Sequence, residues 1–115
     1  MKRTACVAWL LVAGLGAVHA QPYTPSQSAF LKGEIRHAQE RFVEQAAAIS
    51  GVPATRIRQW VPTDGRDDPP KVRVVPALER ERGTPLTEEQ RQKILKADQD
   101  RYDAIERAKK EALMK

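Results

Sequence analysis

The pattern that most limits the fold is a run of apolar residues at helical spacing between residues 25 and 50. These residues recur every three or four positions and so share one face of a helix: Leu31, Ile35, Ala38, Phe42, Ala46 and Ile49. Thr24 stands before Pro25, and Gln27 follows the threonine by three residues, which is the arrangement of a capping box with proline at the first helical position. Gly51 favours a left-handed helix end. The sequence therefore predicts a helix over 25–50.

A second helical pattern covers residues 87–113. Thr87 is again followed by a glutamine three residues later, Gln90. The apolar residues assigned to one side of this helix are Ile94, Tyr102, Ile105, Ala108 and Ala112. That stripe is narrow, and pairs of opposite charge such as Glu89 with Lys93 add ~0.2–0.5 kcal/mol each. We expect a long C-terminal helix with much of its surface in solvent.

Proline and glycine divide the chain between these two helices. The sequence predicts short helices over 54–61 and 76–82. Residues 62–70 are rich in proline and aspartate, which favours a surface loop that could act as a hinge. Val72 and Val74 alternate with charged residues but have no second strand to pair with, so a short extended segment is expected. The predicted fold is all-α: a small helical hairpin or bundle with a proline-rich central loop and a long C-terminal helix.

Residues 1–20 have the three parts of a secretory signal peptide. A basic end precedes an uncharged run over 5–18, and a small residue, Ala20, ends the segment. The run has 14 residues, fewer than the ~17 that cross a bilayer core. Cys6 precedes most of the run, whereas a lipid-modified cysteine would follow it. We expect cleavage after Ala20, which leaves 21–115 as a single small helical domain, periplasmic or secreted, with no stable membrane anchor.

The residues needed for several chemistries are scarce after this cleavage. It removes the only cysteine and one of two histidines, leaving His37. Disulfides and cysteine nucleophiles are then excluded, and a closed metal site needs more nitrogen or sulfur ligands than one chain offers. Glu34 and Glu40 lie within a turn of His37, which fits at most a weak surface metal contact. We therefore expect a protein that is not an enzyme and needs no cofactor or metal.

The surface charge and the small apolar content favour association with protein. Loss of the leader lowers the formal net charge from +5 to +3, and both signs are mixed along the chain. Such a surface favours solubility more than the binding of a polyanion. Many apolar residues of the mature part are alanines, so association would add stability. We predict that Phe42, Ile57, Trp60 and Val61 bind another protein or a second copy of the chain, as in a homodimer.

Residues 43–61 also resemble the helix-turn-helix of DNA-binding proteins, with Gly51 at the turn. In that arrangement Arg56, Arg58 and Gln59 would face the major groove. An exported helical hairpin needs the same glycine and the same apolar positions, and no nucleic acid is expected outside the cytosol. DNA binding is the alternative function if the leader is not a signal peptide.

The segment Leu86-Thr87-Glu88-Glu89-Gln90 opens the C-terminal helix. Through Leu86, Thr87 and Gln90 it resembles the LTxxQ-motif periplasmic proteins (Spy/CpxP-like), over residues 86–113. The resemblance implies an all-helical, commonly dimeric periplasmic protein that acts in envelope stress as a chaperone, signalling modulator or metal-responsive sensor. A threonine cap with glutamine three residues on also fits an ordinary helix start. We predict a protein-binding protein of the bacterial envelope, chaperone-like or a stress-response accessory.

Overall fold

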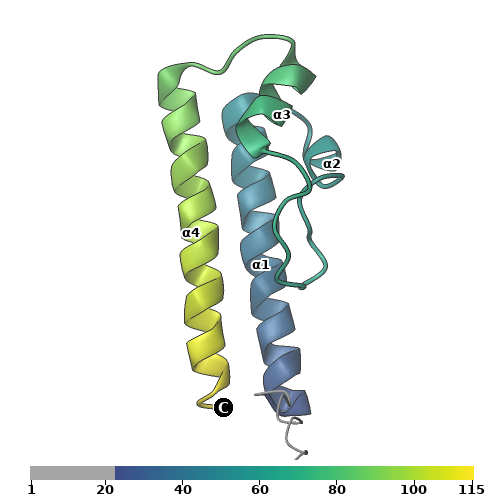
Figure 1. The fold of residues 1–115 in the computed structure, drawn as a ribbon, viewed down its shortest axis with the longest axis vertical. Helices are drawn as coiled ribbons and strands as arrows, with labels where there is room; N and C mark the ends of the chain where they lie inside the picture. Colours follow the sequence, from purple (N-terminus) through teal and green to yellow (C-terminus); the bar gives the residue numbers. More distant parts are fainter. Residues whose placement is uncertain (1–22) are drawn as a thin grey trace, which may run out of the picture.

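The computed structural model of the chain describes residues 23–115, and this part contains four helices and no strand. In chain order they are α1 (Pro25–Ser50), α2 (Ala54–Ile57), α3 (Val74–Arg82) and α4 (Glu88–Ala112). Figure 1 shows α1 and α4 side by side as a long hairpin, with the short helices α2 and α3 beside the end at which the chain turns back. The predicted all-α fold with a long C-terminal helix is confirmed, and α4 packs on α1.

The first helix has the ends that its sequence predicts. The Thr24 side chain accepts a hydrogen bond from the backbone N–H of Gln27 at 3.1 Å, and the Gln27 side chain accepts one from the Thr24 N–H at 2.8 Å. This is a complete capping box. At the other end Gly51 has a φ of 82° and donates its N–H to the Ala47 carbonyl, the left-handed cap that glycine adopts with least strain.

The two short helices differ in length from the prediction. Helix α2 ends at Ile57, because the Gln59 and Trp60 N–H groups then bond to carbonyls three residues earlier and form tighter turns. Helix α3 starts at Val74, so the predicted extended segment is wrong at that residue. Pro76 lies in the first turn of α3, where a backbone N–H has no partner within the helix and its loss costs little.

The core consists of a large and a small cluster. The large cluster joins all four helices; its buried members are Phe42, Val43, Ala46, Val52, Ile57, Val61, Leu78, Leu86, Ile94 and Ala97. The small cluster lies further down the hairpin, between α1 and α4, and consists of Ile35, Ala38 and Ile105, with Leu31 and Ala104 partly buried against it. The upper half of the hairpin is therefore covered by the short helices, whereas the lower half is mainly a two-helix layer.

The 62–70 loop lies against α1 and is not the free hinge that its composition predicts. Gly65 is buried, although most of its neighbours in the loop are exposed. Its N–H donates to the side chain of Gln39 on α1. In the described part of the chain, none of the helices has the length and hydropathy to cross a membrane.

Candidate functional site

The four residues predicted to bind protein lie together, but they face the chain's own core. The exposed fractions of Phe42, Ile57 and Val61 are 1%, 0% and 2%. Trp60 is half-buried against the same cluster. The structure thus assigns the first three to packing between helices, and a partner could reach them only after the helices separate. The large exposed apolar side chains lie elsewhere.

Large exposed apolar side chains lie along one face of helix α4 and at Leu113, the residue that caps its C-terminal end. Met114, the next residue, is 78% exposed. Leu95 is 50% exposed, Tyr102 55% and Leu113 57%. Their positions are separated by about two and about three further turns, which aligns them on one side of a helix. We call these three residues the α4 stripe. Tyr102 was expected on the inner side with Ile94 and Ile105; those two isoleucines are buried, whereas the tyrosine points outward.

Two apolar hollows border the hairpin. One has a volume of about 280 Å³ and lies between α4 and the segment before α3, with Pro70, Val72 and Leu95 among its lining residues. Because Val72 is itself 38% exposed, this hollow extends the α4 stripe sideways. The other, of about 330 Å³, lies between α1 and α4 and is lined in part by Ile49 and Ala97.

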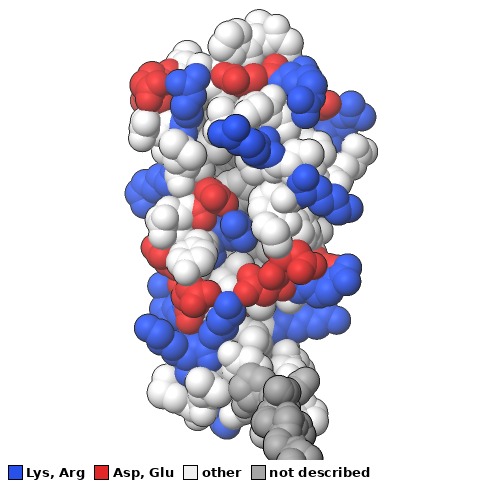
Figure 2. Space-filling model, viewed as in Figure 1, with Lys and Arg blue, Asp and Glu red and all other residues white. Residues whose placement is uncertain are grey.

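Charge on the surrounding surface is mixed. Figure 2 shows Lys and Arg side chains interspersed with Asp and Glu over the whole drawn face, with uncharged surface between them. Several of these are neighbours on α4, for example Lys96 with Asp100 at 3.2 Å and Lys93 with Glu89 at 3.5 Å. A surface of this kind has no field of a single sign to attract a polyanion.

The motif at the start of α4, residues 86–90, has a structural role beyond capping that helix. Leu86 is 4% exposed and belongs to the large core cluster. Thr87 caps α4, and the Gln90 Oε1 accepts a hydrogen bond from the Thr87 N–H at 2.9 Å. The Gln90 Nε2 donates to the carbonyl of Ile49 at 3.0 Å, and the Arg82 Nη1 donates to the Gln90 Oε1 at 3.1 Å.

These bonds join three helix ends at one residue. The Ile49 carbonyl lies in the last turn of α1, where carbonyls lack partners within the helix. A capping box accepts glutamate or glutamine equally well. Only glutamine can also donate to Ile49, so the structure gives a reason for this side chain at position 90. The motif clamps the start of α4 to the ends of α1 and α3.

The segment that resembles a helix-turn-helix lacks a recognition helix. Helix α2 has 4 residues, about one turn, whereas a helix that reads the major groove presents several side chains along its length. The Arg56 Nε lies 2.8 Å from Glu81 Oε1, and the Arg58 Nη2 lies 2.9 Å from Glu40 Oε2. The Glu81 carboxylate raises the pKa of Arg56, mainly through their hydrogen bond. Both guanidinium groups are thus engaged within the chain.

Side chains that could bind a metal do not gather in the described part of the chain. Among residues 23–115 there is no group of three or more histidine, cysteine, aspartate or glutamate side chains placed to hold a metal ion. The His37 Nδ1 is 3.8 Å from Glu34 Oε2, and Glu40 pairs with Arg58 instead.

Comparison of the chain with protein-family models, with curated proteins and with solved structures finds no match. The likeness to LTxxQ-motif proteins stays a prediction that depends on Leu86, Thr87 and Gln90. What the structure defines is a class, an all-α helical hairpin covered at one end by two short helices.

Proposed function

We propose that this protein is a small, exported, non-enzymatic helical protein that binds other polypeptides or a second copy of itself in the bacterial envelope, as a chaperone-like or stress-response accessory protein. The observation that carries the proposal is the α4 stripe, three large apolar side chains that are each at least half exposed on one helix face. Burial of such area against a partner is favourable by ~25 cal/mol per Å².

The surroundings of the α4 stripe support this function. The hollow beside Leu95 and Val72 adds apolar area next to the helix, and charged side chains such as Lys96 and Asp100 flank it. An apolar centre with a charged, hydrated rim is the usual anatomy of a protein interface. The spacing of the α4 stripe suits an amphipathic helix or an unfolded segment laid along α4.

Export after cleavage at Ala20 is compatible with this fold. Every described helix begins after that position, since α1 starts at Pro25. Removal of residues 1–20 therefore takes away none of the four helices.

The test is a double variant of the α4 stripe. Leu95→Gln with Tyr102→Gln removes two apolar side chains but keeps good helix formers at both positions. Arg107→Gln, at another exposed position of α4, is the matched control. Circular dichroism checks that all three proteins have the same helix content.

Two measurements then test whether the double variant has lost self-association or client binding. Sedimentation velocity reports self-association, and light scattering reports how well each protein suppresses aggregation of a chemically denatured client. We expect the double variant to lose whichever activity the wild-type chain has, and the control to retain it. A wild-type chain that stays monomeric and leaves client aggregation unchanged contradicts the proposal.

A further inference from the structure

The α4 stripe has an apolar hollow at one end and a projecting apolar side chain at the other. The hollow of about 280 Å³ is lined by Leu95, Val72 and Val75 among others. About 27 Å further along the helix, the side chain of Leu113 is 57% exposed. A surface with a recess at one end and a projection at the other can complement a second copy of itself that is turned end for end.

Such a pairing is an antiparallel contact between the α4 helices of two copies, related by a twofold axis. When Leu95 of one copy lies opposite Leu113 of the other, the axis repeats the same contact at the other end of the helix pair. The axis then passes the helices at residue 104. The two Tyr102 side chains lie on either side of it, about 6 Å apart along the helix direction, which is within the ~4.5–7 Å range of aromatic contacts. Each residue of the α4 stripe therefore meets an apolar side chain of the other copy.

The charges along α4 also favour the antiparallel direction. Residues 88–100 contain four acids and three bases, so their formal charge is −1. Residues 101–115 contain five bases and three acids, so theirs is +2. Antiparallel pairing sets each half against the half of opposite sign, whereas parallel pairing sets like against like. The helix dipoles add a preference in the same direction.

We propose that the α4 stripe is the interface of a symmetric dimer, in which the α4 helices of two copies pack antiparallel. In this dimer Leu113 of each copy lies against Leu95 and Val72 of the other, at the edge of the hollow, and the two Tyr102 rings meet near the axis. The inference rests on the proposed function and names its partner as a second copy of the chain. A client polypeptide that uses the same stripe competes with that copy.

The size of the contact makes this dimer a weak one. Helix α4 has 25 residues, which gives a length of about 38 Å, and packed helices lie about 8–10 Å apart. One face of α4 therefore covers on the order of 400 Å², about half of the ~800 Å² that each partner buries in an interface of standard size. The two copies should exchange readily, which leaves the α4 stripe uncovered in the free chain.

Disulfide cross-linking tests the pairing and its direction in the full chain. Cys6 is the only cysteine, so Cys6→Ser provides a background for the single variants Leu95→Cys and Leu113→Cys. The two chains are oxidised separately and as an equal mixture, and peptide mapping by mass spectrometry identifies the linked positions. A disulfide joins Cα atoms that lie about 4.4–6.8 Å apart, so we expect at least about fivefold more cross-linked product in the mixture than in either chain alone.

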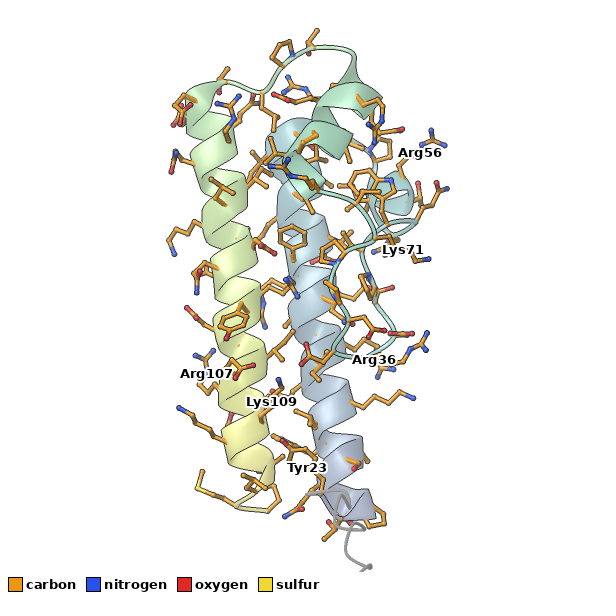
Figure 3. The ribbon with its side chains drawn as sticks, viewed as in Figure 1. Tyr23, Arg36, Arg56, Lys71, Arg107 and Lys109 are labelled. Carbon is orange, nitrogen blue, oxygen red and sulfur yellow. The ribbon has the colours of Figure 1, made fainter. Side chains whose placement is uncertain are left out.

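Arg107→Cys in the same background is the matched control. Arg107 is exposed and lies about a third of a turn around the helix from the direction of Leu113. Figure 3 shows its side chain on the side of α4 away from α1. Its mixture with Leu95→Cys should give no such increase.

Sedimentation velocity over a range of concentrations measures the dimerisation constant. We expect a concentration-dependent dimer for the wild-type chain. Leu113→Asp should weaken it at least about tenfold, because symmetry places a charge in an apolar contact at both ends of the interface. Arg107→Asp should leave it unchanged. Leu113 lies at the exposed end of α4, and circular dichroism checks that both variants keep the helix content of the wild-type chain.

Three results overturn the inference. They are a chain that stays monomeric at every concentration, a dimer whose cross-links join two copies of Leu95→Cys, and a dimer that Leu113→Asp leaves unchanged. A monomeric chain that still suppresses client aggregation through the α4 stripe assigns the stripe to a client, and the proposed function then stands. A monomeric chain that leaves client aggregation unchanged contradicts the proposed function as well.

Discussion

Replacement of Gln90 by glutamate tests whether this residue clamps three helix ends. Glutamate keeps the acceptor for the Thr87 N–H and for Arg82, so the capping box survives. It removes the donor to the Ile49 carbonyl. A lost hydrogen bond costs about 0.5–1.5 kcal/mol. The added charge is favourable at the start of α4 and unfavourable at the end of α1 by similar amounts of ~0.3–1 kcal/mol, so these effects largely cancel.

The expected loss in the free energy of unfolding for Gln90→Glu at pH 7 is therefore about 1 kcal/mol. Urea denaturation followed by circular dichroism measures it. Below a pH of ~4.3 the introduced carboxyl takes up a proton and can donate to Ile49 again, so the difference from the wild-type chain should shrink. Stability data at pH 7 and pH 4 give both values.

Gln27→Glu is the matched control for this experiment. Gln27 has the same place in the capping box of α1, but its Nε2 makes only a 3.5 Å contact with the Lys115 carbonyl at an exposed site. Its substitution should change the stability by less than about 0.5 kcal/mol. Equal effects at positions 27 and 90 would refute the idea that the second glutamine joins helices.

Three further substitutions have outcomes set by the structure. Phe42→Ala empties a site with 1% exposure and should lower the free energy of unfolding by about 3–5 kcal/mol, seen as a large fall in Tm. Gly51→Ala, at a φ of 82° with open space around it, should cost about 1 kcal/mol with no change of fold by circular dichroism. The hydrogen bond from Arg56 lowers the pKa of Glu81, so Arg56→Ala should return that pKa toward its ordinary value in an NMR titration. The stability this pair provides is present above the unfolded pKa of Glu81 and is lost as the pH falls through its lower folded value.

The helix ends were predictable because their signals are local. Thr24 with Gln27, Thr87 with Gln90, and the glycine at position 51 act within a few residues of themselves, and the structure has each helix end where these residues place it. The end of α2 and the start of α3 depend on how turns tighten around neighbouring prolines, and no short motif specifies that. The errors in the middle of the chain lie at these positions.

The apolar pattern alone does not show which apolar side chains are buried within the chain and which are exposed on its surface. A stripe shows which residues avoid water, but Phe42 and Ile57 could equally meet a partner or another part of the same chain. The structure shows that Ile94 of α4 belongs to the cluster that buries them. Tyr102 lies at the edge of its helix face, where a small change in rotation decides whether a side chain is covered.

One signal in the sequence did point to the loop contact. Gln39 is adjacent to Ala38 within the apolar face of the first helix, and a buried amide needs partners for both polar atoms. The sequence does not say which segment supplies them. The pairing with Gly65 and Arg66 joins residues about 26 positions apart, which local patterns do not report.

We propose that this protein binds polypeptides along α4, through the exposed side chains of Leu95, Tyr102 and Leu113. Hydrogen exchange of the full chain, with and without reduced and carboxymethylated α-lactalbumin as an unfolded client, measures protection of each segment in one experiment. We expect slower exchange along α4 from Leu95 to Leu113 when the client is bound. Exchange that is unchanged along this part of α4 at a saturating client concentration would contradict the proposal.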